Sequence, residues 1–312
     1  MVVFSNRASS VLYNFLKTNG FRNRFLLPAN VCPVVPLTMM KAGVDFEFVD
    51  IDDRHTMCED LALQKMQNGN YAGILFVHSY GKIFNNSGFY KKIKAISPDL
   101  CIIDDRCLCR PELDGLKPDN VDLVLYSTGY AKYVELSYGG YGVTDIEIDN
   151  YNYPFSEEEE NKQQVYIKNC LLNNTQYELP ADYPWLDGSE LTMEKDQYFG
   201  VIRNKISQID KNKSIINEIY KNNLPKDIQW EGYDNWRFMI EVEKRDEILN
   251  AIFNNGLFAG TNFPSVSWMF KGTHSINAEK ESKHIINLFN DFRVNEDFAV
   301  RICKIINTVI NN

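Results

Sequence analysis

The stretch Leu100-Cys101-Ile102-Ile103-Asp104-Asp105 decides the fold that the sequence predicts. Its short apolar run contains β-branched residues and is closed by two acids, which is typical of a buried parallel strand that ends at a functional edge. Asp105 is then expected at the carboxyl end of the strand. A second such strand is predicted over residues 121–126, and Ser127-Thr128-Gly129-Tyr130-Ala131-Lys132 follows it directly. In open α/β sheets, ligands bind at the edge where the carboxyl ends of parallel strands meet.

The order of segments through the first half of the chain predicts an α/β fold. Strand-like segments are expected at residues 46–49, 73–77, 100–103 and 121–126, and helical or turn segments alternate with them. This alternation favours a mostly parallel sheet flanked by helices. Helical spacing predicts a long helix or helix pair over residues 191–221, and strands and helices mix after residue 227. We therefore expect a large domain over residues 1–215 and a smaller C-terminal α+β domain over residues 216–312.

Three kinds of group along the predicted edge suit one cofactor. Lys132 is an amine, Asp105 is a carboxylate, and anion donors are expected at Ser127 and at the start of the first helix, residues 5–10. A helix N-terminus presents unpaired N–H groups and a positive dipole end to an anion. Pyridoxal 5'-phosphate (PLP) needs a lysine to hold it as a Schiff base, a carboxylate to keep its pyridine nitrogen protonated, and donors for its phosphate. Taken alone, Asn6 is more simply a helix cap, so the combination carries the prediction.

Several motifs follow one another in an order and at spacings that are more specific than any one of them. They are residues 26–33 with 41–43 and 48–52, Phe76-Val77-His78-Ser79-Tyr80-Gly81, Ile103-Asp104-Asp105, Ser127 with Lys132 five residues later, Gly139-Gly140, and residues 284–288 with 294–297. Together these segments resemble the DegT/DnrJ/StrS family of PLP-dependent sugar aminotransferases. The resemblance covers most of the chain and implies the aspartate-aminotransferase fold, known as PLP-dependent transferase fold type I.

The resemblance also implies a reaction and a set of site residues. PLP would be held by Lys132 as a Schiff base, with Asp105 against its pyridine nitrogen and Ser127 on its phosphate. The positions that match other cofactor contacts of the family are Asn6, Arg7, Ala8, Cys32 and Leu108. The reaction implied is transfer of an amino group from glutamate or glutamine to a nucleotide-linked keto-sugar, in surface-polysaccharide or deoxysugar biosynthesis, by a homodimer.

The chain departs from the family's pattern at several positions. Cys32 stands near where an aromatic usually stacks on the cofactor ring, Leu108 where a glutamine or histidine is usual, and Tyr138 where a glutamate is usual. The segment by which the family reaches the partner subunit's site has no counterpart. Two alternatives therefore stay open: a PLP enzyme that transfers no amino group, such as a sugar dehydratase, and a catalytically degenerate homologue that binds PLP or a nucleotide sugar. Lys132 weighs against the dehydratases in which this residue is replaced.

Three further side chains are candidates for contact with substrate. His78 and Tyr80 follow a predicted strand, and Arg237 lies between two aromatic residues, where it could hold a carboxylate with two parallel hydrogen bonds. A hydrogen-bonded structural histidine and a surface-stacked arginine are the alternatives. Asp104 is expected to tolerate substitution better than Asp105.

The composition excludes several classes of function. With 42 acidic and 33 basic residues the net charge is −9, which argues against binding of nucleic acid or an anionic membrane. No apolar run reaches membrane-spanning length, so we expect a cytosolic protein. Seven scattered cysteines predict reduced thiols, and Cys and His pairs at zinc-like spacing do not occur, so no metal site is expected. The acidic run at residues 157–160 is interpreted as a capped, solvated helix start without a catalytic role.

Overall fold

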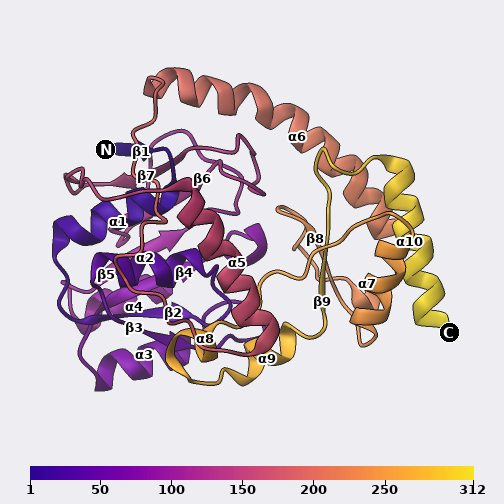
Figure 1. Cartoon of the computed structure of the whole chain (residues 1–312), viewed down its shortest axis with the longest axis horizontal. Helices are drawn as coiled ribbons and strands as arrows, with labels where there is room; N and C mark the ends of the chain where they lie inside the picture. The colour runs from indigo at the N-terminus through magenta and orange to yellow at the C-terminus, as the bar shows by residue number, and fades with distance from the viewer.

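The predicted strands all belong to one seven-stranded sheet in the computed structural model, which describes residues 1–312 (Figure 1). Three of them lie side by side at its centre, and the strand at residues 46–49 forms one edge. The strands are β1 (Val2–Ser5), β2 (Arg24–Pro28), β3 (Phe46–Val49), β4 (Tyr71–Val77), β5 (Cys101–Asp105), β6 (Leu123–Ser127) and β7 (Gly140–Thr144). They lie in the order β1-β7-β6-β5-β4-β2-β3. All neighbouring pairs from β6 to β3 are parallel, whereas β7 runs antiparallel to both of its neighbours. The prediction of a mostly parallel sheet is confirmed.

Both faces of this sheet are buried, as apolar parallel strands require. In β6, Leu123 and Leu125 belong to one core and Val124 and Tyr126 to another, since successive side chains of a strand point to opposite faces. The first core includes residues of α1 (Ala8–Asn19), α2 (Val34–Ala42) and α5 (Glu157–Asn173). The second includes residues of α3 (Glu59–Asn68), α4 (Ser87–Ile96) and the first half of α6 (Lys195–Asn223). The large domain therefore has three layers, with helices on both sides of the sheet.

The register of the sheet aligns the segments that later form the candidate site. Gly140 of β7 pairs with Ser5 of β1 on one side and with Ser127 of β6 on the other. Because β1 leads directly into α1, the first turn of α1 begins at the same level as the end of β6. A Cβ atom on Gly140 would lie 2.3 Å from the backbone nitrogen of Ala8, so this close approach requires glycine. On the other side of β6, Asp105 at the end of β5 pairs with Leu125, so β6 continues two residues beyond the end of β5.

A separate core begins on α6 at Ile216, on the right of Figure 1, and the elements around it are called the small domain below. It surrounds an antiparallel pair of strands, β8 (Phe238–Glu241) and β9 (Ile285–Leu288), together with α7 (Arg245–Asn254) and α10 (Glu296–Asn311). Two short helices return to the large domain, α8 (Ser267–Lys271) and α9 (Ile276–Glu281). Met269 of α8 joins the first core of the large domain, and Ala278 of α9 packs with Ala29 and Ile51. The last third of the chain thus contributes to both domains.

The long helix α6 joins the two domains and carries a buried amine at their junction. Residues 195–223 form one helix rather than a pair, and although it is long, neither it nor any other helix is apolar enough to cross a membrane. Lys213 is buried, and its Nζ donates to the carbonyl of Trp236 and to Oδ1 of Asn290, each at 2.7 Å. Burial lowers the pKa of Lys213 to about 7. A neutral amine still donates both hydrogen bonds, so the junction favours the uncharged form.

We expect Lys213 to make stability rise with pH, an effect best resolved below about pH 8, because the buried thiols, whose pKa values burial raises, act in the opposite direction at higher pH. An unfolded lysine titrates near pH ~10.4, so between about pH 7 and that value the unfolded chain holds a proton that the folded chain has lost. The free energy of unfolding then increases with pH across this window, by at most about 1.4 kcal/mol per pH unit from this group. Urea unfolding near pH 7 and near pH 8 measures the change.

The matched variants for this measurement are Lys213→Met and Lys211→Met, the second of which removes an exposed lysine of the same helix. Lys213→Met should reduce the increase in the free energy of unfolding with pH, whereas Lys211→Met should leave that increase unchanged. Equal pH dependence in the wild type and Lys213→Met would contradict the role assigned to the buried amine.

Candidate active site

A cavity of about 350 Å³ opens at the carboxyl edge of β5 and β6. Its wall includes most of the residues that the sequence places in a cofactor site, namely Arg7, Ala8, Cys32, Asp105, Ser127 and Lys132. These residues come from separate segments of the chain, and they meet because parallel strands present their carboxyl ends at one edge. The volume lies within the range of pockets that hold small molecules, ~300 to 1,000 Å³.

The start of α1 and Ser127 form a part of the wall that suits an anion. No side chain caps α1, and the third and fourth N–H groups of the helix turn back to the carbonyl of Arg7. The N–H groups of Ala8 and Ser9 are left for a ligand, because the first N–H groups of a helix have no partner inside it. The Ser127 hydroxyl oxygen accepts a hydrogen bond from the Gly129 N–H at 3.2 Å, which leaves its own hydrogen to donate. Backbone N–H groups, a hydroxyl and the helix dipole together suit a phosphate.

Asp105 presents a carboxylate to the same cavity. It is nearly buried, and its Oδ1 accepts the N–H of Cys107 at 2.9 Å, which fixes the side chain at the end of β5. Burial raises the pKa of the Cys32 and Cys107 thiols, and the charge of Asp105 acts in the same direction. Both thiols are therefore neutral. The groups in this part of the wall that can take part in acid–base or covalent chemistry are the Asp105 carboxylate and the Lys132 amine.

The backbone before Lys132 is held in an unusual conformation by the small domain. Ala131 has a φ of 56°, a left-handed conformation that costs a residue with a side chain roughly 1–2 kcal/mol. Its N–H donates to Oε2 of Glu135 at 2.8 Å, and its carbonyl accepts the indole N–H of Trp236 at 2.7 Å. Glu135 is itself paired with Arg293, with 2.5 Å between Oε2 and Nη2. Two residues of the small domain thus fix the loop that carries Lys132.

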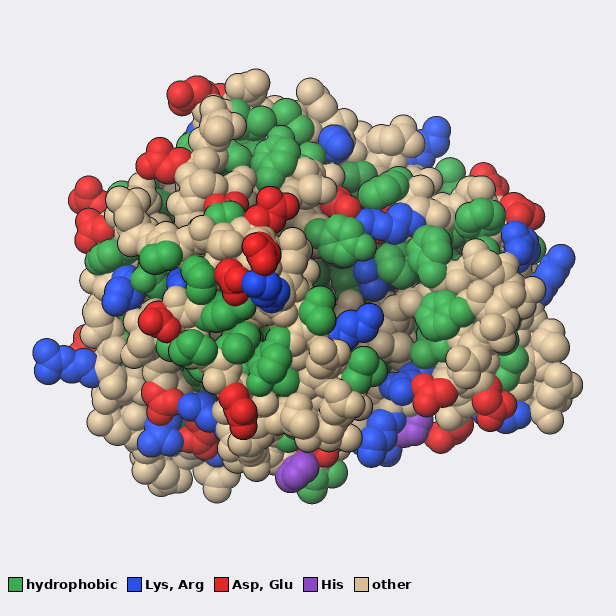
Figure 2. Space-filling view, viewed as in Figure 1, with side chains coloured by type: hydrophobic (Ala, Val, Ile, Leu, Met, Phe, Trp, Pro, Cys, Tyr) green, Lys and Arg blue, Asp and Glu red, His purple; other side chains and the backbone are tan.

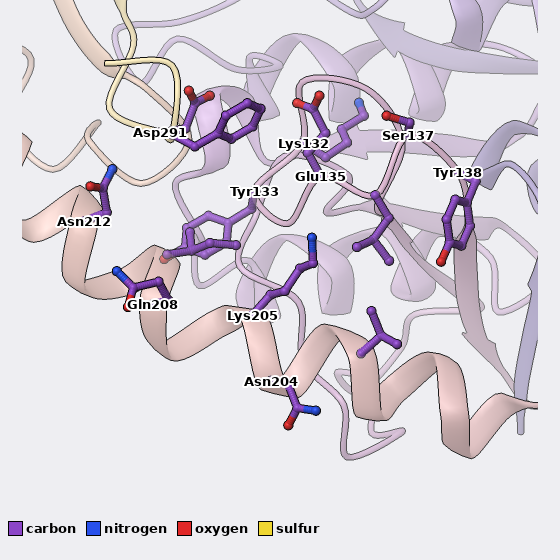
Figure 3. A pocket seen from close by; sticks show the side chains of 14 residues that line it. Lys132, Tyr133, Glu135, Ser137, Tyr138, Asn204, Lys205, Gln208, Asn212 and Asp291 are labelled. Atoms are coloured by element: carbon purple, nitrogen blue, oxygen red, sulfur yellow. The ribbon is translucent and has the colours of Figure 1, made fainter. Parts of the chain in front are cut away.

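A larger cavity of about 740 Å³ shares Lys132 and Ser137 with the first (Figure 3). It lies between α6 and the loop of residues 132–138, and Lys205 points from the helix toward this loop. Its other polar lining residues are Tyr133, Glu135, Tyr138, Asn204, Gln208, Asn212 and Asp291. Amide, hydroxyl and charged groups in this number suit a polar ligand with several hydroxyl or phosphate groups. Lys132 therefore lines both the cavity with the anion site and the larger cavity.

His78 and Tyr80, expected as substrate contacts, lie away from both cavity walls. His78 is buried, with Nε2 2.6 Å from Oδ1 of Asp104 and with Nδ1 accepting the N–H of Phe84 at 3.0 Å. Tyr80 is fully buried and donates to Oε1 of Glu281 at 2.7 Å. A short turn after β4 directs both side chains into the protein. The assignment of these residues to a substrate site is therefore unsupported, and the structural alternative for His78 fits its contacts.

Leu108 and Asn6, expected as cofactor contacts, also lie outside the wall of the smaller cavity. Leu108 packs with Trp236 in an apolar cluster at the domain junction, because the chain turns inward after Asp105. The side chain of Asn6 donates to Oδ2 of Asp187 at 2.6 Å and to Oγ of Ser189 at 3.1 Å. Asn6 thus supports the entry to α1 through protein contacts. Arg237 lies at the domain junction, outside both walls, and is considered separately below.

The wall also contains residues that the sequence did not predict. They are contributed by α5 and by the segment that follows it, and include Glu160, Gln164, Trp185 and Asp187. Ser156 caps α5 as predicted, but Glu160 faces the cavity, 4.0 Å from Arg7, which corrects the interpretation of the acidic run as wholly solvated. Trp185 gives the wall an aromatic surface, which Cys32 lacks. It lies in a loop without periodicity, so no sequence signal marked it.

No protein-family model and no curated protein matches the chain by sequence. Solved structures do match its fold. The sugar aminotransferase CalS13 from Micromonospora echinospora is 13% identical with a TM-score of 0.69, and the match covers 98% of this chain and 87% of that one. PseC from Helicobacter pylori, an aminotransferase of pseudoaminic acid biosynthesis, is 15% identical with a TM-score of 0.69 and coverages of 99% and 86%.

DesI, solved in the presence of its TDP-sugar product, is 16% identical with a TM-score of 0.72 and coverages of 98% and 80%. At sequence identities this low, the similarity shows that the fold is shared. The chain therefore has the PLP-dependent transferase fold, type I, that the sequence resemblance implied.

Asp104, next to Asp105 in the chain, is the centre of a buried network. It is fully buried and accepts hydrogen bonds from the Tyr90 hydroxyl at 3.1 Å and from Nε of Arg106 at 3.0 Å, in addition to its contact with His78. Burial acts to raise the pKa of Asp104, but His78 and Arg106 outweigh it and keep the pKa below its usual value. These contacts lead us to expect, contrary to the prediction from the sequence, that Asp104 tolerates substitution less well than Asp105.

We expect Asp104→Asn and Asp105→Asn to separate stability from function. Asp104→Asn removes the buried carboxylate that Arg106 and His78 share, although Arg106 keeps Glu112, and should lower the free energy of unfolding by about 1.5–3 kcal/mol. Asp105→Asn retains the acceptor for the Cys107 N–H and should change it by less than about 1 kcal/mol. Urea unfolding of both variants measures the difference. If the Asp104→Asn variant were as stable as the wild type and the Asp105→Asn variant were destabilised, the structural role would belong to Asp105 and not to Asp104.

Proposed function

We propose that the chain is a PLP-dependent aminotransferase that moves an amino group from glutamate or glutamine to a nucleotide-linked keto-sugar. The observation that carries the proposal is the meeting of Lys132, Asp105, Ser127 and the first turn of α1 in one cavity. The fold is shared with proteins described as sugar aminotransferases, and one of these was solved with a TDP-sugar product. Other solved relatives are described in their PLP and pyridoxamine phosphate forms.

The residues present fit PLP in kind and in number. The uncapped start of α1 and the Ser127 hydroxyl suit the phosphate, and Asp105 suits a protonated pyridine nitrogen. Lys132 is the single lysine in the wall of this cavity and would hold the aldehyde carbon of the cofactor. When bound, PLP supplies an electron sink for the negative charge that develops at the substrate carbon.

The residues of the chain would supply the charge, the proton transfer and the exclusion of water that the reaction needs. The Asp105 carboxylate keeps a proton on the pyridine nitrogen, and the apolar wall formed by Leu12, Val35 and Leu125 excludes water from the site. The Lys132 amine would take a proton from the substrate carbon and return it. The hydrogen bonds on both sides of Ala131 hold this amine at the boundary of the two cavities.

The larger cavity is proposed as the site for the sugar. It borders Lys132 and carries Asn204, Gln208 and Asn212 along one face of α6, which suit sugar hydroxyls. Lys205, pointing toward the loop, suits a phosphate of the nucleotide. In Figure 2 the surface is hollowed between the two lobes, and Lys and Arg side chains lie along this hollow. This placement favours entry of an anionic substrate in spite of the negative net charge of the chain.

A catalytically degenerate PLP-binding homologue remains the second candidate. Cys32 in the cavity wall, at the position near which the resembled family usually has a stacking aromatic, favours it. Trp185, which lines the same cavity, favours the active enzyme instead. The two candidates differ in whether an amino donor reacts with the bound cofactor.

We expect PLP to attach covalently to Lys132. Borohydride reduction of the PLP-loaded protein followed by peptide mapping should place the label on Lys132, and Lys132→Ala should abolish labelling. Lys205→Ala, which removes the other lysine that borders the larger cavity, should leave the label in place. A label on another lysine would overturn the site. Glutamate or glutamine should then convert the absorption of the bound cofactor to that of pyridoxamine phosphate, and an unchanged spectrum with every amino donor would favour the degenerate homologue.

We also propose that the working unit is a homodimer, as the family resemblance implies. Two residues that line the cavity, Val34 and Tyr130, are 37% and 74% exposed, so the cavity is open on a side that a second copy could cover. Sedimentation of the PLP-loaded protein at micromolar concentration should show a dimer. A monomer under these conditions would contradict the proposal, whatever the result of labelling.

A further inference from the structure

Arg237 is a nearly buried arginine at the start of β8, and its guanidinium lies against two aromatic rings. The residue is 5% exposed. Its guanidinium carbon lies 4.3 Å from the centre of the Trp236 ring and 3.8 Å from that of Phe289. A planar guanidinium that rests on aromatic faces keeps its N–H groups directed outward from its edges.

The N–H groups of Arg237 have no acceptor in the protein. No hydrogen bond leaves its guanidinium, and no carboxylate lies within 4.0 Å of it, whereas the other buried arginine, Arg106, is bonded to Asp104, Glu112 and Tyr126. Burial lowers the pKa of Arg237 to about 10, the direction expected for a charge that lacks a partner. A buried, unpaired charge costs stability, so its retention calls for another role.

The guanidinium also has space around it that the fold has left open. Its nitrogens are not among the enclosed polar atoms without a partner, so they reach solvent although the residue is buried. A Cβ atom at Gly260 would lie 2.5 Å from Nη1 of Arg237, so the absence of a side chain there makes room for the guanidinium. The position is therefore built to hold this group.

Arg237 is connected through its neighbour Trp236 to the loop that carries Lys132. Its neighbour Trp236 donates to the carbonyl of Ala131, the residue before Lys132. The nearest acids are already engaged, because Asp291 and Glu135 both pair with Arg293. Arg237 thus lies next to the residue that binds the loop of Lys132, and no carboxylate is paired with its positive charge.

We propose that Arg237 binds an anionic group of a substrate, a carboxylate or a phosphate, with two parallel hydrogen bonds. The identity of that substrate, an amino donor or a nucleotide sugar, rests on the proposed function. The binding of an anion does not, because it requires neither PLP nor a reaction. A guanidinium fixed between rings presents its paired N–H groups in the geometry that a carboxylate or phosphate accepts.

Thermal unfolding of the full chain without added PLP tests this proposal, with glutarate and inorganic pyrophosphate as probes. A ligand that binds the folded chain raises the unfolding midpoint. At least one probe should raise it for the wild type, and Arg237→Gln should weaken that probe's affinity by at least about tenfold. Arg237→Lys should retain part of the rise in the unfolding midpoint, because it keeps the positive charge but loses the pair of parallel N–H groups. Glutarate alone would identify a carboxylate site, and pyrophosphate alone a phosphate site.

Two controls separate binding from structural effects. Arg301→Gln removes an exposed arginine of the same domain that lies 5.7 Å from the Phe298 ring, and should leave the response unchanged. Without a probe, Arg237→Gln should unfold at the same temperature as the wild type or higher, since it removes an unpaired buried charge. A large fall in that midpoint would indicate a structural role and overturn the proposal.

Ser127→Ala distinguishes the two anion sites of the chain. A response that is lost in Ser127→Ala and kept in Arg237→Gln would place the anion at the start of α1 and overturn the role of Arg237. The absence of any response in the wild type would also overturn it. Neither result affects the labelling of Lys132, so failure here is distinct from failure of the proposed function.

Discussion

The close approach of β7 to the start of α1 is the constraint on which the candidate site depends. Gly140 lies between Ser5 and Ser127 in the sheet, and it leaves no space for a Cβ atom beside the nitrogen of Ala8. Because of this contact, α1 begins level with the end of β6, and its free N–H groups face the same cavity as the Ser127 hydroxyl. A larger residue at position 140 would separate the helix from the sheet and divide the anion site. The anion-binding part of the cavity is thus made largely by the backbone.

The opposite side of the site depends on hydrogen bonds between the domains. The left-handed backbone of Ala131 is bonded on one side to Glu135 and on the other to the Trp236 indole. The carbonyl of Trp236 is in turn bonded to Lys213 of α6. The long helix, the small domain and the loop of Lys132 are therefore connected through a single residue. A movement of the small domain relative to the sheet would move the backbone at the lysine, as in enzymes that close around a ligand.

The buried charges of the chain fall into two groups that differ in their partners. Asp104 and Arg106 bind each other inside the large domain, and their mutual pairing offsets the cost of removing both from water. Asp105 faces the cavity beside them, and Arg237 is buried at the domain junction without a carboxylate. Paired charges of this kind belong to the framework of the protein. Groups left unpaired at a cavity or at a domain junction are where a ligand can supply the missing partner.

Local patterns in the sequence were sufficient to predict the fold class and much of the cavity wall. The alternation of strand-like and helical segments predicted the sheet, and residues directly at strand ends, such as Asp105 and Ser127, lie where local geometry places them. Residues a few places beyond a strand end, such as His78 and Leu108, could not be placed from the sequence, because the path of a turn depends on its packing against other elements. Trp185 and Glu160 likewise reach the wall through contacts between segments far apart in the chain. Strand periodicity is a local property of the chain. The contacts of a loop side chain, by contrast, depend on the packing of the whole fold.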